Sequence, residues 1–262
     1  MRYIEKYQPQ NLNQVLYPNL AVEQLVKSVA ANSTSSNLIL FGPMGTGKSL
    51  LAQLIAEELA SKRIVDVEVF QGTQLRTAAK ADDLIQRIEK QRFLYNVFAD
   101  RRMYIIEEFD RVPLESQLGF GHLLTTPDLQ FILTTNSVSD IDARLVSRAL
   151  PCKVTGATQQ DMEQLVQRVL SNEGVSATPT EVAKLITSVN GNVRDLMNGL
   201  EVLVLQKRLQ SVPAVPQPVA PVAPQPVAQA VQQPPVQPLP PASLAVTVTP
   251  PQQPAPSAQP TP

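Results

Sequence analysis

Cysteine and histidine are almost absent from this sequence, which contains one of each (Cys152 and His122) and no tryptophan. One cysteine excludes a disulfide framework and a cysteine cage for a metal, and one histidine argues against a histidine-based zinc site. No apolar run approaches the roughly 20 residues that span a bilayer, and the first residues do not resemble a signal peptide. We therefore expect a cytoplasmic protein (in the host cytoplasm if the source is viral) with no membrane partner.

Charge and glycine are missing from residues 211–262, which hold 17 of the 24 prolines. A segment of Pro, Ala, Val and Gln cannot bury enough apolar surface to fold alone, so we predict a disordered tail. We interpret it as an uncharged spacer. The alternative is that its proline runs, such as residues 234–241, dock on a partner that binds proline-rich motifs.

Short apolar runs alternate with helical patterns over residues 1–156. The runs at residues 37–41, 103–106 and 131–134 predict buried strands, with further strands at 64–69 and 152–154. Apolar residues recur with a helical period after residue 49, which predicts one helix, and again over about residues 81–97, which predicts another. This alternation predicts an α/β domain with a parallel sheet flanked by helices. From residue 157 to 210 the pattern is helical only, with capping sequences at Thr158 and Thr178, and predicts a small three-helix lid.

Residues 42–49 match G-x-x-x-x-G-K-S between a predicted strand and a predicted helix. The glycines let the loop wrap around phosphate oxygens, and the helix presents its positive end to the same anion. Lys48 would add a charge at the β- and γ-phosphates, and Ser49 a hydroxyl for magnesium. The alternative is a glycine-rich turn that occurs by chance, but such a turn would not need to lie between a buried strand and an amphipathic helix. The sequence therefore predicts a P-loop site for a nucleoside triphosphate.

Polar residues follow two of the other predicted strands. Glu107 and Glu108 come directly after residues 103–106, where one carboxylate can hold magnesium and the other can polarise the attacking water. Two acids after a strand also occur in solvated turns, but the phosphate loop favours the catalytic interpretation. Asn136 ends the next strand, either to orient water and the γ-phosphate or as a strand-end cap. Arg148 and Arg194 are candidate functional residues only because these groups accompany them in the sequence.

These motifs, in this order, resemble those of AAA+ ATPases of the sliding-clamp-loader branch. Residues 4–9, which read I-E-K-Y-Q-P, resemble the E-K-Y-R-P box of replication factor C small subunits, with Gln8 in place of arginine. Residues 106–117 are similar to the D-E-F-D-R…E-S-Q of phage clamp-loader ATPase subunits, and residues 147–149 read Ser-Arg-Ala. The similarity covers about residues 3–208.

The resemblance implies a role for each matching residue. Glu108 would activate water, Lys48 would bind the phosphates, Asn136 would be the first sensor, and Arg148 would act in trans on the ATP of a neighbouring subunit. Ser49 and Glu107 would hold Mg²⁺, although the family usually carries Asp where Glu107 stands. The whole set of nucleotide contacts would be Glu5, Lys6, Tyr7, Val15, Leu16, Gly42, Gly45, Thr46, Gly47, Lys48, Ser49, Leu50 and, from the lid, Arg194 as the second sensor.

The implied function is that of an ATP-hydrolysing subunit that works in a homo- or hetero-oligomer of AAA+ subunits and loads a sliding clamp on primer–template DNA. The net charge of −1 provides no overall basic field, so DNA contacts would be local. Residues 76–102 carry an excess of three positive charges, suited to the DNA backbone, although a solvated helix face explains them as well. The basic residues there are Arg76, Lys80, Arg87, Lys90, Arg92, Arg101 and Arg102.

Two alternatives remain open from the sequence. Another AAA+ enzyme that remodels DNA complexes, such as a helicase loader or a transposition regulator, shares every catalytic part. The second alternative is a non-hydrolysing scaffold with a structural nucleotide. It would explain why Glu107 stands where the family usually has Asp, and why a proline-rich tail stands where clamp loaders have a helical collar domain. Without a collar, assembly would depend on ATP-bridged contacts, on DNA, or on partners that bind the tail.

Overall fold

The computed structural model describes residues 1–92 and 99–211. The predicted tail from residue 212 on, and the predicted helix from residue 93 on, lie outside the described residues. The described residues belong to one compact unit. The predicted domain boundaries stay predictions.

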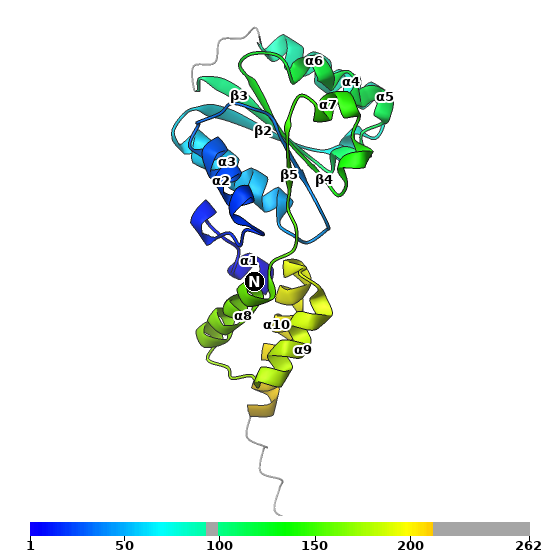
Figure 1. Cartoon of the computed structure of the whole chain (residues 1–262). Coiled ribbons are helices and arrows are strands. Elements are labelled where there is room, and N and C mark those ends of the chain that lie inside the picture. Colours follow the sequence, from blue (N-terminus) through cyan, green and yellow to red (C-terminus); the bar gives the residue numbers. More distant parts are fainter. Residues whose placement is uncertain (93–98, 212–262) are drawn as a thin grey trace, which may run out of the picture. The chain divides into compact units, whose positions relative to one another are not determined.

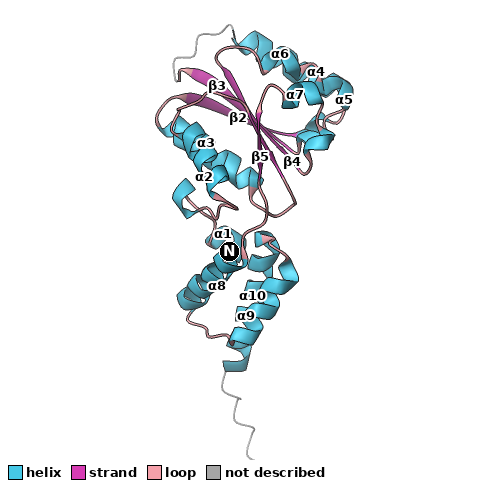
Figure 2. Ribbon diagram, viewed as in Figure 1, coloured by secondary structure: helices cyan, strands magenta, loops and turns pink. Residues whose placement is uncertain are grey.

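Five parallel strands form one sheet in the order β2-β3-β4-β1-β5 (Figure 2). Their bounds are Leu38–Phe41 (β1), Val65–Gln71 (β2), Arg101–Glu107 (β3), Leu129–Thr135 (β4) and Leu150–Lys153 (β5). Strand β1 lies between β4 and β5, and its Leu38 pairs with Ile132 on one side and Leu150 on the other. The loop that follows β1 therefore begins beside the end of β4. The parallel sheet confirms the predicted fold class.

Helices cover both faces of the sheet (Figure 1). Helices α2 (Leu20–Ala30) and α3 (Lys48–Ser61) pack on one face, and α4 (Ala78–Arg92), α5 (Leu114–Gln117), α6 (Phe120–Leu123) and α7 (Ala143–Val146) lie on the other. Successive side chains of a strand point to opposite faces, so Leu38 and Leu40 join the first core and Ile39 the second. Short 3₁₀ helices lie in the connections, at Leu12–Gln14 (η1), Gly72–Leu75 (η2), Phe109–Arg111 (η3) and Val138–Asp140 (η4).

Helices α8 (Gln159–Glu173), α9 (Pro179–Val189) and α10 (Val193–Ser211) follow the sheet and surround a third core. Thr158 and Thr178 form capping boxes with the residues three positions later, as their sequences predicted, and Pro179 opens α9. The chain leaves α9 through Asn190, whose φ is 45°. Tyr3 of α1 (Tyr3–Lys6) also joins this core, so the start of the chain packs against its last described helices.

Candidate nucleotide-binding site

The loop between β1 and α3 has the backbone of a phosphate-binding loop. Gly45 and Gly47 have φ angles of 77° and 88°, a left-handed conformation that glycine adopts without the steric cost of a Cβ. Gly47 is the N-cap of α3, a helix of 14 residues whose first N–H groups have no partner within the helix. Loop and helix therefore present backbone donors and the positive end of a dipole at one place, which suits an anion.

A cavity of about 400 Å³ opens over this loop. Besides the loop, it is lined by the opening segment of the chain, by the ends of β3 and β4, and by the helices α8 and α10. Of the predicted nucleotide contacts, its lining includes Tyr7, Val15, Leu16, Gly45, Thr46, Gly47, Lys48, Ser49, Leu50 and Arg194. Glu5, Lys6 and Gly42 do not line it, and their role as contacts stays a prediction. Arg168 of α8, which the sequence did not single out, lines it as well.

The ammonium group of Lys48 lies at the centre of the polar contacts of this cavity. Its Nζ donates to the carbonyl oxygens of Gly42 and Pro43, both at 2.8 Å, and to Oδ1 of Asn136 at 3.3 Å. Burial lowers the pKa of Lys48, an effect that the nearby carboxylate of Asp110 partly offsets. A phosphate group arriving here would meet a cation that is held in place by the loop itself and by the end of β4.

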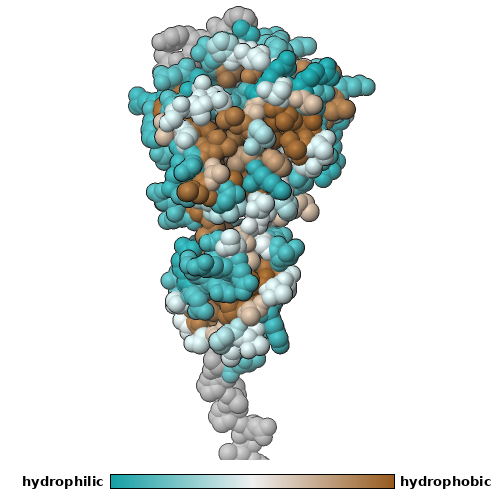
Figure 3. Space-filling view, viewed as in Figure 1, coloured by the Kyte–Doolittle hydropathy of each residue, from teal (hydrophilic) through white to brown (hydrophobic). Residues whose placement is uncertain are grey.

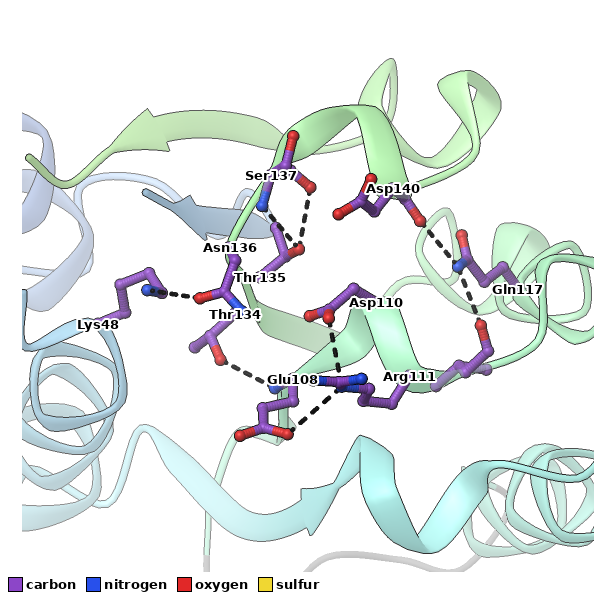
Figure 4. A network of polar contacts seen from close by, with 11 residues as sticks. Lys48, Glu108, Asp110, Arg111, Gln117, Thr134, Thr135, Asn136, Ser137 and Asp140 are labelled. Atoms are coloured by element: carbon purple, nitrogen blue, oxygen red, sulfur yellow. Dashed lines mark hydrogen bonds and ion pairs between the residues drawn. The ribbon is translucent and has the colours of Figure 1, made fainter. Parts of the chain in front are cut away.

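Glu108 stands directly after β3 in a left-handed backbone conformation, with a φ of 49°. Its N–H donates to Oγ1 of Thr134 on β4 at 3.1 Å, and its carboxylate is about half exposed at the cavity (Figure 4). Backbone strain of this kind in a non-glycine residue persists only where neighbouring groups hold it. The contact with β4 fixes the backbone of Glu108, while its carboxylate lies 3.8 Å from Nε of Arg111 and stays open to the cavity.

Glu107 is buried beneath this surface. Its carboxylate accepts hydrogen bonds from Nε2 of Gln71 at 2.8 Å and from Nε2 of Gln53 at 3.4 Å, and it does not line the cavity. The two neighbouring acids are therefore in different environments. Only Glu108 reaches the open space, and the role of Glu107 as a metal ligand stays a prediction.

Asp110 is a third carboxylate at the cavity, and sequence reasoning assigned it no role. Its side chain is only 11% exposed, and its Oδ1 is buried without a hydrogen-bond partner. Its other oxygen lies 3.5 Å from Nε of Arg111, an ion pair drawn in Figure 4. The signal was present in the sequence, because Asp110 follows Glu107 by three residues in a short turn. An oxygen without a partner beside Lys48 is an acceptor available to a ligand or to water.

Gln117 joins the segment after β3 to the segment after β4. This side chain is 1% exposed, and its Nε2 donates to the carbonyl oxygens of Val112 at 3.1 Å and Asp140 at 3.2 Å (Figure 4). Its Oε1 accepts from the backbone N–H of Asp142 at 2.9 Å. Gln117 thus links α5 to the start of α7, a contact across 25 residues that the sequence pattern does not reveal.

The opening segment is tied to the lid by one buried carboxylate. Glu173, at the end of α8, is 5% exposed and accepts from Nζ of Lys6 and Oη of Tyr7, both at 2.6 Å. Its other oxygen accepts from Nη2 of Arg208 at 2.6 Å. Glu5 instead pairs with Arg2. Lys6 therefore serves the lid contact, whereas Tyr7 both holds Glu173 and lines the cavity.

We expect the Glu173→Gln variant to lose about 1–3 kcal/mol of stability at neutral pH, since it removes a buried charge with three hydrogen-bond donors. Hydrogen bonds from Lys6 and Tyr7 lower the pKa of Glu173 from its ordinary 4.5 to about 2. A lowered pKa in the folded state contributes stability that is complete above pH 4.5 and lost as the pH falls toward 2. Urea unfolding at pH 7 and at pH 3 measures both effects. A difference between variant and wild type that is equal at the two pH values would contradict the assignment.

Arg148 lies far from this cavity in the sheet topology. It lines a second hollow together with the starts of β3, β4 and β5, whereas the first cavity opens at the ends of β3 and β4. In a parallel sheet these are opposite edges, so Arg148 belongs to another surface than Lys48 and Glu108. Arg144, four residues earlier, is held by Asp142 through Nε and Nη2, both at 3.0 Å.

A family model described as "ATPase family associated with various cellular activities (AAA)" matches residues 38–152. The replication factor C small subunit of Natronomonas pharaonis is 25% identical over 203 residues, which cover 76% of this chain and 61% of that protein. Replication factor C subunit 3 of Saccharomyces cerevisiae is 24% identical over 209 residues, covering 76% of this chain and 58% of the relative. This chain thus spans about three fifths of the length of these relatives.

Two solved structures share the fold. A point mutant of RuvB from Thermotoga maritima superposes with a TM-score of 0.59 at 15% identity, covering 79% of this chain and 68% of that one. The replication initiator DnaA, bound to AMPPCP and single-stranded DNA, superposes with a TM-score of 0.57 at 18% identity, covering 77% of this chain and 66% of that one.

Within residues 1–92 and 99–211, no helix is long and apolar enough to cross a membrane. In the same residues, no three His, Cys, Asp or Glu side chains group as metal ligands.

Proposed function

Because this chain is an AAA+ protein of the clamp-loader family, we propose that it binds and hydrolyses ATP in the cavity over residues 42–49 and, within an oligomer, loads a sliding clamp on primer–template DNA. One observation carries the proposal. The phosphate loop with its Lys48, and the residues Glu108, Asn136 and Arg194, come from four separate parts of the chain, yet they line one cavity. Such a set provides a phosphate cradle, a base and sensing groups together.

ATP binding is supported by two kinds of group in the cavity lining. At the loop, backbone N–H groups and Lys48 would hold the phosphates, and Arg194 would reach them from the start of α10. The lining also includes Tyr7 and apolar side chains, among them Val15 and Leu16. An apolar wall with one tyrosine suits the flat adenine ring.

The donor set also fits Mg²⁺, since a serine hydroxyl and carboxylates are the hard oxygen ligands that this ion prefers. Ser49 and Glu107 would hold it, and Asp110, whose Oδ1 has no hydrogen-bond partner, lines the same cavity as Ser49. When bound, the ion would neutralise charge that develops on the phosphate oxygens. Glu107 already accepts from two glutamine amides, which would orient its carboxylate.

Hydrolysis would use side chains from two neighbouring protomers. Glu108 would accept the proton of the attacking water, since its side chain is exposed to the cavity while its N–H is anchored to Thr134. Asn136 would orient the γ-phosphate and keep Lys48 in place. Arg148 would stabilise the transition-state charge in the ATP site of a neighbouring subunit. It lies at the starts of the strands, whereas the ATP cavity of its own protomer opens at their ends.

DNA contacts would be made by basic side chains between residues 76 and 102. Of the basic residues between 76 and 102, Arg87 pairs with Glu68, and Arg101 donates to Gln130 and Asn32, so these two are already engaged. Lys80 and Lys90 on α4 would be freer to meet phosphates of the DNA backbone. Apolar side chains reach the surface among polar ones (Figure 3), and both Leu114 of α5 and Leu118, directly after α5, are exposed.

A loading assay tests this function. The chain, a ring-shaped clamp from the same source and ATP are mixed with primed circular DNA, and the clamp that stays on the DNA is counted after gel filtration. We expect ATP-dependent retention that disappears when the circle is cut, since a ring slides off a linear end. Lys48→Ala should abolish retention, whereas Lys62→Ala, a surface lysine of the same segment paired with Glu58, should not. ATP turnover without any retained clamp would point instead to another AAA+ activity on DNA.

A further inference from the structure

The side chain of Arg148 has no polar partner among the described residues. The short helix before it, α7, makes several hydrogen bonds. The carboxylate that feels its charge, that of Asp142, is already occupied by the backbone N–H and the guanidinium of Arg144. The two arginines thus differ. Arg144 is fixed within its own helix, and the guanidinium of Arg148 is left for another molecule.

The backbone of Arg148, in contrast, is anchored. Asn37, the buried residue just before β1, donates from Nδ2 to the carbonyl oxygens of Arg148 at 3.1 Å and Leu124 at 2.6 Å. Its Oδ1 accepts from the N–H of Phe131 on β4 at 2.9 Å. Because the Asn37 side chain is hydrogen-bonded to β4, it holds the main chain at Arg148 in a fixed place. The position of the guanidinium charge therefore depends only on the conformation of the Arg148 side chain.

That side chain lies against Gly121 of α6. A Cβ added at Gly121 would be 2.4 Å from Nη1 of Arg148, while the next nearest atoms, Cζ of Arg148 and Cδ2 of Leu145, are 3.7 Å away. The guanidinium therefore occupies the space that any other residue at position 121 would fill. Phe120 and Leu123, on either side of this glycine, are fully buried, so α6 itself is firmly placed.

We propose that Gly121 is a positioning residue for Arg148, a bare helix position on which the guanidinium lies and which sets its reach toward the nucleotide of the neighbouring subunit. This rests on the proposed trans role of Arg148. Ordinary contact begins at 3.4 Å, so a methyl group at position 121 displaces Nη1 by about 1 Å. A misplacement of about 1 Å lowers a catalytic rate by as much as ~100-fold.

The test is Gly121→Ala in a mixture that separates the two roles of a protomer. A Lys48→Ala chain lacks a working site of its own and supplies only Arg148, whereas an Arg148→Ala chain supplies only the site. Mixed, the two should hydrolyse ATP although neither does so alone. Gly121→Ala placed in the Lys48→Ala chain should lower this turnover by about 10- to 100-fold. Placed in the Arg148→Ala chain, it should change nothing, because no guanidinium is there to displace.

Folding controls keep the result interpretable. Alanine suits a helix better than glycine, and the atom it meets is the end of a flexible side chain, so the melting temperature should be unchanged or higher. Gly119→Ala is the matched variant, since its Cβ meets Cδ1 of Ile85 at 2.6 Å and not Arg148. It should leave the turnover of the mixture unchanged.

Each remaining outcome counts against a distinct claim. If the parent mixture is inactive, the trans role of Arg148 fails, and the inference about Gly121 fails with it. If the parent mixture is active but Gly121→Ala lowers turnover equally from either chain, or from neither, the trans role stands and the positioning role of Gly121 is overturned. Loss of the melting transition in Gly121→Ala would assign this glycine a structural role instead.

Discussion

Replacing Arg148 by alanine is expected to lower ATP turnover by 10³-fold or more, with nucleotide affinity within about twofold of wild type. An arginine supplied in trans to a transferring phosphoryl group is worth about 10³–10⁵ in rate. The side chain of Arg148 does not line the cavity of its own protomer, so its loss removes nothing from the ATP-binding groups. The measurement is steady-state phosphate release at saturating ATP, with affinity determined separately by titration of a fluorescent ATP analogue.

Arg144→Ala is the matched control for this prediction. Arg144 lies on the same short helix and carries the same charge, but its guanidinium is bound to Asp142. We expect turnover close to that of wild type and a small loss of stability, since the guanidinium end of the pair is largely exposed. A large effect of Arg144→Ala with little effect of Arg148→Ala would reverse the assignment of the two arginines.

Glu108→Gln is expected to lower turnover by about 10²–10⁴-fold, the usual contribution of a general base, while ATP remains bound. Glutamine keeps the size of the side chain, and the hydrogen bond from the N–H of residue 108 to Thr134 does not depend on the carboxylate. Single-turnover phosphate release from a prebound ATP complex measures the chemical step. We expect ATP to remain intact on the variant long after the wild type has converted it to ADP.

The control for this variant is Glu115→Gln, which neutralises an exposed carboxylate of α5 that does not line the cavity. It should turn over ATP as the wild type does. If Glu108→Gln hydrolyses ATP at the wild-type rate, the proton goes to another group. Asp110, whose Oδ1 is buried at the same cavity without a partner, would then be the candidate to test.

Much of the fold was predictable because its signals are local. The strand before the phosphate loop, the glycines at 45 and 47, and the helix after them form one continuous segment, and the structure has them in that form. The capping boxes at Thr158 and Thr178 are likewise read from four successive residues. Patterns of this length report the conformation of their own segment, which is why they succeed without any tertiary information.

The contacts that the sequence did not predict connect residues far apart in the chain. Lys6 was expected beside the nucleotide, but 167 residues later Glu173 provides a buried carboxylate for its ammonium. Gln117 and Asp142 meet because α5 and α7 cover the same face of the sheet. The space for the Arg148 guanidinium exists only because residue 121 has no side chain. No periodicity encodes such pairs, since each depends on how two segments pack.

The most direct test of the account is ATP turnover per chain measured against protein concentration, with and without primer–template DNA. If the site is completed by Arg148 of a neighbour, turnover per chain should rise steeply as protomers associate, rise further with DNA, and stay flat in Arg148→Ala. A turnover per chain that is constant over the whole concentration range would contradict the account, because it would mean that one protomer contains the entire catalytic site.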